Sequence, residues 1–163
     1  MILGHSERRQ YFGESNKLIN LKMRKAIGAG LCPIVCVGET LGEREKGVTD
    51  QVVTTQITGV LQGLSVSDMS RVVVAYEPVW AIGTGLNATP EQAQEVHQLI
   101  RKLFVQQFGQ SVSENVLILY GGSVKPDNAA GLLVQNDIDG ALVGGACLKA
   151  DSFLAIIRST KSS

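Results

Sequence analysis

The chain has 163 residues, 44% of them hydrophobic and 18% charged, a composition that predicts one compact domain and excludes a disordered chain. Fifteen basic residues balance fifteen acidic ones, so no general attraction to nucleic acid or to an anionic membrane is expected, and any anion site must be local. Three cysteines without zinc-type spacing argue against a disulfide framework and favour a reducing cytosol. No apolar run approaches the roughly 20 residues that span a bilayer, and we expect no signal peptide.

Short apolar runs recur along the chain, each followed by glycine or polar residues and then by a helical pattern. Their near-continuous aliphatic character, without polar alternation, is typical of strands buried on both faces of a parallel sheet. The fold class predicted from this alternation is α/β. The predicted strands are 1–3, 33–37, 72–76, 116–120 and 138–143.

The segments between these strands carry helix signals. Ser15 can cap a helix over 15–29, and Thr89 begins the clearest one, with Gln92 at capping-box spacing and Pro90 at the first helical position. That helix is predicted to run to about Phe108. The other predicted helices are 48–64, 126–133 and 152–158.

The number of βα units limits the architecture. A complete eight-stranded barrel typically takes about 250 residues, so five units predict an open curved sheet or part of a closed barrel. The first and fifth strands would then each present an unpaired edge unless another segment covers it.

Functional side chains of such folds collect at the carboxyl ends of the strands. Glu77 directly follows the third predicted strand, where a partly apolar setting would disfavour its charge and strengthen it as a base. Standing alone, it could equally be a helix-capping or ion-paired glutamate. The segment 78–85 behind it holds apolar residues and two glycines, which suits a lid that closes over a ligand and leaves the N–H of Gly83 free for an anion. A loop packed permanently on the rim is the alternative.

Two histidines and one cysteine are further candidates. His5 lies between the first strand and a short polar segment, where a neutral imidazole could donate to a substrate oxygen, although a structural role is the commoner one at a strand end. His97 lies in mid-helix among polar residues, so we expect it on the solvated face. Cys36 is interpreted as a small buried hydrophobic residue, since no partner base is near it in sequence.

Glycine pairs follow the last two predicted strands. Backbone N–H groups around Ser123 and at Gly144 and Gly145 can converge on one phosphate without any lysine. One such pair is usually only a tight turn, but phosphate sites after the last two strands recur in barrels.

Taken in order, these residues resemble the triose-phosphate isomerase family, and the resemblance covers the whole chain. It implies a single partial (β/α)8 barrel domain over residues 1–163 that begins at what looks like the family's fourth strand. The matching runs are GHSERR at 4–9, CVGE at 36–39, YEPVWAIGTG at 76–85, YGGSV at 120–124 and LVGGA at 142–146.

The resemblance implies the interconversion of dihydroxyacetone phosphate and D-glyceraldehyde 3-phosphate in glycolysis and gluconeogenesis, in the cytoplasm. Carried over from the family, Glu77 moves the proton, neutral His5 polarises the oxygens, Glu7 is a supporting carboxylate and Ser6 holds the base in the open state. No metal or organic cofactor is implied. The family's phosphate-binding amides correspond to Gly83, Ser123, Gly144 and Gly145.

The departures from the family are equally informative. The first three βα units are absent from this sequence, with the family's active-site Asn and Lys and the long loop through which its members form homodimers. Leu86 stands where a lysine is common. Losing a group that stabilises transition-state charge typically costs about 10²–10³ in rate. The alternative function is therefore a catalytically impaired phosphate-binding or self-associating α/β module.

Overall fold

A computed structural model describes residues 1–160 of the chain. Strands and helices alternate along it, as the pattern of apolar runs predicts. The elements are β1 Ile2–Leu3, α1 Ser6–Phe12, α2 Asn16–Gly28, β2 Ile34–Val37, α3 Leu41–Glu45, α4 Thr49–Leu61, α5 Val66–Met69, β3 Val73–Tyr76, η1 Val79–Ala81, α6 Pro90–Phe108, α7 Gln110–Asn115, β4 Ile118–Tyr120, α8 Ala129–Leu133, β5 Gly140–Ala141, η2 Gly145–Leu148 and α9 Ala150–Arg158.

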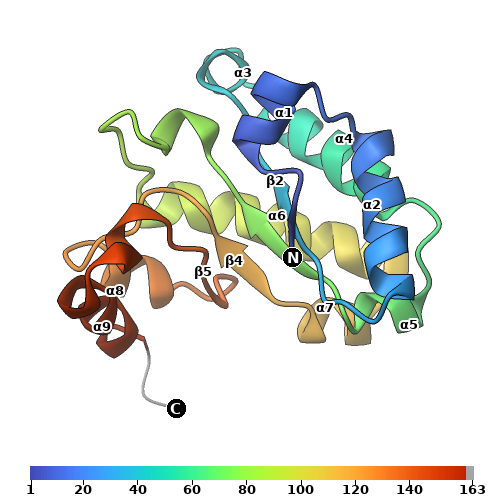
Figure 1. Cartoon of the computed structure of the whole chain (residues 1–163). Helices are drawn as coiled ribbons and strands as arrows, with labels where there is room; N and C mark the ends of the chain where they lie inside the picture. Colours follow the sequence, from blue (N-terminus) through green and yellow to red (C-terminus); the bar gives the residue numbers. More distant parts are fainter. Residues whose placement is uncertain (161–163) are drawn as a thin grey trace.

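The five strands form one parallel sheet in the order of the chain, β1 to β5. Because consecutive strands are neighbours and all point the same way, the connecting helices return on one side, where α2, α4, α6 and α8 pack in that order. Figure 1 shows α6 passing behind the strands, with α4 and α2 on their right. The predicted α/β fold with a partial barrel arrangement is confirmed.

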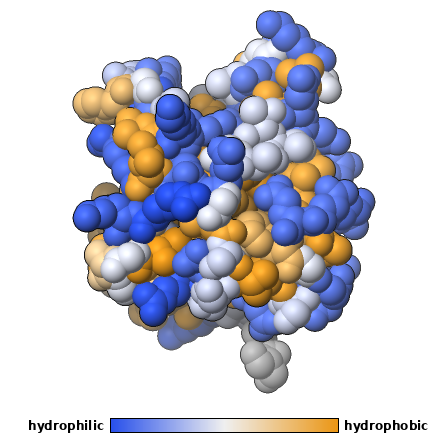
Figure 2. Space-filling view, turned by 90° about the vertical axis from the view of Figure 1, so that its right-hand side faces the viewer, coloured by the Kyte–Doolittle hydropathy of each residue, from blue (hydrophilic) through white to orange (hydrophobic). Residues whose placement is uncertain are grey.

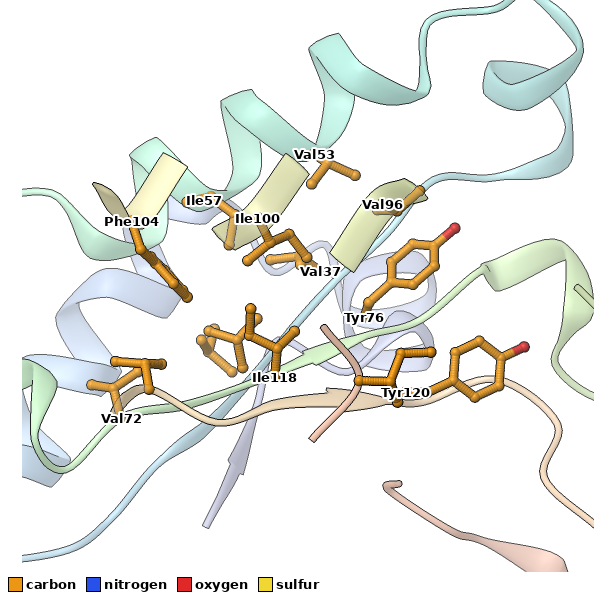
Figure 3. Close-up of a cluster of buried hydrophobic side chains, with 14 of the residues drawn as sticks. Val37, Val53, Ile57, Val72, Tyr76, Val96, Ile100, Phe104, Ile118 and Tyr120 are labelled. Atoms are coloured by element: carbon orange, nitrogen blue, oxygen red, sulfur yellow. The ribbon is translucent and has the colours of Figure 1, made fainter. Parts of the chain in front are cut away.

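The core lies between the sheet and this helix layer. Figure 3 shows Val53 and Ile57 of α4 and Ile100 and Phe104 of α6 above the strands, and all four side chains are fully buried. Ile57 and Val53, like Phe104 and Ile100, are four residues apart, which places each pair on one face of its helix. The helices are thereby fixed on the strands, and the strand ends become a rigid support for the site.

The start of α6 follows the sequence signal. Thr89 accepts a hydrogen bond at its hydroxyl from the N–H of Gln92, whose side chain accepts one from the N–H of Thr89, and Pro90 is the first helical residue. The helix ends at Phe108, as predicted.

Other boundaries differ from the predictions for local reasons. The helix predicted over 48–64 ends at Leu61, because Gly63 takes a left-handed conformation with φ of 66°, and a separate helix α5 begins after Ser65. Helix α8 begins at Ala129 rather than 126, since Asn128 folds its side chain back onto the preceding turn. Helix α9 begins two residues earlier than predicted, at Ala150.

The prediction for His97 is wrong. Its side chain is fully buried in α6, with ring centroids 5.8 Å from Tyr76 and 6.4 Å from Tyr120. Its position follows from the helical period, since Ala93 and Ile100, four residues before and three after it, are buried on the same face.

Apolar side chains remain at the two edges of the sheet. Met1, Ile2 and Leu31 are exposed near β1, and Leu148 and Leu154 are exposed in and after η2 at the β5 side. Figure 2, which views the right-hand side of Figure 1, shows apolar patches interrupted by hydrophilic residues. In the described part of the chain, no helix combines the length and the apolar character needed to cross a bilayer.

Candidate active site

A cavity of about 410 Å³ opens at the carboxyl ends of the strands. The candidate base, the histidine and the predicted phosphate-binding residues all line it, although they come from four different strand ends. The lining residues are Ile2, His5, Glu77, Ile82, Gly83, Gly121, Gly122, Ser123, Val124, Lys125, Leu142, Val143, Gly144, Gly145 and Ala146.

Glu77 is fixed at the end of β3 by backbone and side-chain contacts. Its N–H donates to the carbonyl of Val37 at 2.7 Å, which extends the pairing of β3 with β2 by one residue. Its Oε2 accepts from the N–H of Ser6 at 2.8 Å, and its Oε1 lies 3.1 Å from Nε2 of His5. The residue is only 2% exposed, and burial raises the pKa of its carboxyl, partly offset by His5 and Ser6. A carboxylate of raised pKa is a stronger base, as the sequence predicts.

The ring of His5 is oriented by the helix that follows it. His5 is the N-cap of α1, and its Nδ1 accepts from the N–H of Glu7 at 3.3 Å. Because Nδ1 accepts, the ring proton lies on Nε2, which faces Glu77. Ser6 and Glu7 therefore contribute through their backbone N–H groups, while the carboxylate of Glu7 is exposed.

Gly121 lies directly beside the base. A Cβ atom built on it would lie 2.9 Å from Cγ of Glu77 and 3.1 Å from the carbonyl oxygen of Tyr76. A larger residue at this turn would push the base aside, so the first glycine of the pair is needed to admit the Glu77 side chain.

Cys36 lies under the base and is fully buried, as predicted. Burial raises the pKa of its thiol far above its usual range, and the nearby charge of Glu77 adds to this effect. Because a nucleophile must be a thiolate, the side chain is suited to packing rather than to attack.

The segment after Glu77 is only partly a loop. Val79–Ala81 forms the 3₁₀ turn η1, and Trp80 and Ala81 are buried, whereas Leu86 is half exposed. Within residues 78–85 no apolar side chain is exposed, since Pro78 is also buried and Val79 and Ile82 are half-buried, so the expectation of exposed apolar residues is wrong for this segment. Gly83 lines the cavity with φ of 69°, so its left-handed turn directs the backbone toward the site.

A buried carboxylate holds this segment in place, and the sequence interpretation did not assign it a role. Glu39 is fully buried and accepts from Nε1 of Trp80 at 2.8 Å, from the hydroxyl of Tyr76 at 3.1 Å and from Arg44 at 2.9 Å. The sequence held a signal for this residue, because Glu39 comes two residues after β2, much as Glu77 comes one residue after β3. The indole N–H needs a partner when buried, and this glutamate supplies it.

The predicted anion-binding residues line the same cavity as His5 and Glu77. Asn128 clamps the turn after β4: its amide donates to the carbonyl of Ser123 at 3.0 Å, and its Oδ1 accepts from the N–H of Lys125 at 2.8 Å. Gly144 and Gly145 begin the short turn η2. Lys125 also lines the cavity, so the site has a nearby cation that the interpretation of lysine-free turns did not include.

Groups that could hold a metal ion do not occur together in the described part of the chain, where no cluster of three His, Cys, Asp or Glu side chains is present. The chemistry that the arrangement supports is proton transfer between a desolvated carboxylate and a substrate carbon, assisted by an imidazole N–H, with backbone N–H groups available for an anion.

Comparisons with known proteins agree over nearly the whole chain. The sequence profile of the family described as triosephosphate isomerase matches residues 1–160. The triosephosphate isomerase of Chlorobaculum tepidum is 59% identical over 160 residues, which are 98% of this chain and 64% of the relative. That of Herminiimonas arsenicoxydans is 60% identical over 159 residues, with the same shares. That of Geobacter metallireducens is 58% identical over 157 residues, 96% of this chain and 62% of the relative. The chain thus spans less than two thirds of the length of these relatives.

Proposed function

Because the chain belongs to the triosephosphate isomerase family, we propose that its site interconverts dihydroxyacetone phosphate and D-glyceraldehyde 3-phosphate through an enediolate. The observation that carries the proposal is the pair at the cavity: a buried carboxylate of raised pKa, Glu77, 3.1 Å from the imidazole Nε2 of His5. Glu77 removes a proton from the carbon beside the carbonyl and returns it to the neighbouring carbon. The Nε2–H of His5 donates to the oxygens on which negative charge develops.

The contacts of the Glu77 carboxylate must change when substrate binds. Both carboxylate oxygens of Glu77 are engaged, one by the N–H of Ser6 and the other by His5. The substrate therefore replaces the direct contact of Glu77 with His5, and the base turns from Ser6 toward the substrate carbon. The phosphate is proposed to bind the backbone N–H groups of four residues that line the cavity, Gly83, Ser123, Gly144 and Gly145.

Turnover also requires groups outside this sequence. The family's active-site Asn and Lys belong to units that the present chain does not include, and a missing electrostatic group typically lowers the rate by about 10²–10³. The homodimer, the cytoplasmic location and the glycolytic role of the family are proposed for the protein that contains these units.

The test is complementation. Isomerisation of glyceraldehyde 3-phosphate is measured with the chain alone and with a polypeptide covering the first three βα units of a relative such as that of Chlorobaculum tepidum. We expect activity to appear or rise on mixing and to be lost with Glu77→Gln. The control Glu95→Gln, at an exposed position on α6, should retain activity. Complemented protein that is equally active with Gln at position 77 would contradict the assignment of the base.

A second candidate function rests on the two sheet edges. The outer sides of β1 and β5 carry no neighbouring strand within residues 1–160, and exposed Met1 and Leu148 lie near them. A non-catalytic phosphate-binding module that self-associates through these edges would sediment as a dimer or larger species at micromolar concentration. A folded monomer would exclude the self-associating form.

A further inference from the structure

Arg9 has an unusual set of contacts behind the site. It lies on α1, four residues after His5, and its three guanidinium nitrogens donate in three directions. Nε donates to the carbonyl of Gly4 at 2.9 Å, one terminal nitrogen to Oδ1 of Asn16 at 2.7 Å and the other to the carbonyl of Cys36 at 3.1 Å. All three acceptors are neutral, so Arg9 cross-links backbone rather than neutralising an acid.

The two carbonyls lie where the pairing of β1 with β2 stops, because β1 ends at Leu3, whereas Cys36 lies within β2 and still pairs with Ala75 of β3. β1 pairs with β2 at Ile2 with Ile34 and at Leu3 with Val35, and one further step would bring Gly4 beside Cys36. Gly4 instead turns away with φ of 68°, a left-handed conformation that ends the ladder. Arg9 donates to both carbonyls at this point. Its side chain therefore links the ends of β1 and β2 where backbone pairing between these strands has stopped.

This link between β1 and β2 lies next to His5 and Glu77. The Gly4 carbonyl is part of the peptide bond to His5, and the Cys36 carbonyl is part of the bond to Val37, which in turn accepts from the N–H of Glu77 at 2.7 Å. The spacing between the ends of β1 and β2 therefore sets the spacing between His5 and Glu77.

Unlike Arg9, three other arginines form ion pairs with carboxylates. Arg8 pairs with Glu14, Arg44 with Glu39 and Arg101 with Asp137 and Asp139, whereas no carboxylate within residues 1–160 lies at ion-pair distance from Arg9. Burial lowers the pKa of Arg9, and the carboxylate of Glu77 is among the charges that oppose this effect.

We propose that Arg9 is a positioning residue that holds His5 within hydrogen-bonding distance of Glu77 by bridging the ends of β1 and β2. Its importance for turnover depends on the proposed isomerase function. The contact that it controls, however, is observable without substrate.

The experiment records ¹⁵N spectra of the histidine side chains in the full chain, whose two histidines are His5 and His97. In the wild type we expect the His5 signals of a single tautomer protonated on Nε2. Arg9→Met and Arg9→Lys should convert them to averaged signals of two tautomers, because Met has no donor and the three N–H groups of Lys lie on one nitrogen, which cannot reach the acceptors that the three guanidinium nitrogens reach. The signals of His97 should not change.

The matched control is Arg101→Met. Arg101 also donates to backbone carbonyls, those of Ser113 and Val116, but at the opposite end of the strands. It should alter His97, which shares the carbonyl of Asp137 with Arg101, and leave His5 unchanged. Unchanged His5 signals in a folded Arg9→Met chain, or equal His5 changes in Arg101→Met, would overturn the proposal.

A milder variant covers the case in which Arg9→Met does not fold. Asn16→Ala removes only one acceptor of Arg9 and should give a smaller change in the His5 signals, in the same direction. If the His5 signals of Asn16→Ala do not change, the proposal is overturned. In the complemented enzyme, Arg9→Lys should lower kcat by about 10- to 100-fold with little change in KM. If the wild-type chain is active on complementation and Arg9→Lys does not lower kcat, the positioning role alone is contradicted. If the wild-type chain shows the single His5 tautomer but no activity on complementation, the proposed function alone is contradicted.

Discussion

At the scale of single residues, His97 shows how burial determines protonation. Its Nδ1 lies 3.1 Å from the carbonyl oxygen of Asp137, and its Nε2 has no hydrogen-bond partner within residues 1–160. Burial lowers the pKa of His97 to about 4, with the nearby Asp137, Asp139 and Arg101 making smaller contributions. The imidazole therefore remains neutral in the folded chain over a range in which it is protonated when unfolded.

This difference predicts a loss of stability in acid. Because the unfolded chain binds the proton first, the contribution of His97 falls as pH drops from about 6.5 towards about 4. Urea unfolding of the wild type and of His97→Leu, compared near neutral pH and at about pH 4.5, should show the wild type losing about 2 kcal/mol more than the variant. Parallel losses in the two proteins would show that His97 is not the group responsible.

The raised pKa of Glu77 predicts that stability depends on pH in the opposite direction. Its pKa is raised by burial, so the folded chain binds the proton more tightly than the unfolded chain, and stability falls as pH rises from the ordinary glutamate range through the raised value. Glu77→Gln should therefore gain free energy of unfolding relative to wild type near neutral pH and lose this advantage at about pH 4. A difference between the two proteins that does not vary with pH would contradict the desolvation of the base.

At the scale of elements, the segment after β2 supports the residues that follow β3. Glu39 joins Trp80 and Tyr76 by side-chain hydrogen bonds, and its carbonyl accepts from the N–H of Val79 at 3.0 Å. Gln56 of α4 fixes the same segment by bonding both backbone groups of Gly38, at 2.7 and 3.0 Å. The segment 78–85 is therefore anchored at its beginning, whereas Gly83, Thr84 and Gly85 are exposed.

The anchor can be tested with the only tryptophan in the chain. Glu39→Leu leaves the indole N–H of Trp80 and the cation of Arg44 without their acceptor, which should cost about 3 kcal/mol of unfolding free energy. The emission of Trp80 should shift to longer wavelength as the ring gains water. Glu45→Gln, at an exposed position, is the control and should change neither quantity. Unchanged emission in Glu39→Leu would contradict the anchoring role.

Gly38 gives a steric test of the same segment. A Cβ atom at this position would lie 1.8 Å from the carbonyl oxygen of Glu77, so Gly38→Ala must displace the backbone of the base. We expect more than about 2 kcal/mol of destabilisation. Gly28→Ala, with no atom within 4 Å of the added Cβ, should instead be neutral or stabilising by up to about 1 kcal/mol. Thermal unfolding of both variants distinguishes the two cases, and equal effects would rule out the close contact.

At the scale of the whole molecule, the sequence predicts the sheet and the location of the site because strand ends are marked by local chemistry. Buried aliphatic runs predict the five strands, and Glu77 directly follows one of them. The burial of His97 was missed although the helical period places it on the same face as Ala93 and Ile100. The burial of Trp80 could not be read from a local pattern, because it depends on a contact with Glu39, 41 positions away in sequence. The role of Arg9 likewise depends on Cys36, 27 residues distant, which no local pattern indicates.

The molecule therefore brings the Glu77 carboxylate, the His5 imidazole and the backbone of three glycine-containing turns to one cavity. The most direct measurement is a titration of the ¹⁵N-labelled chain with inorganic phosphate. We predict saturable shifts that are largest at the amides of Gly83, Ser123, Gly144 and Gly145, and absent in a matched titration with chloride. Shifts that do not saturate, or that gather at surface lysines away from this cavity, would contradict a phosphate site facing Glu77.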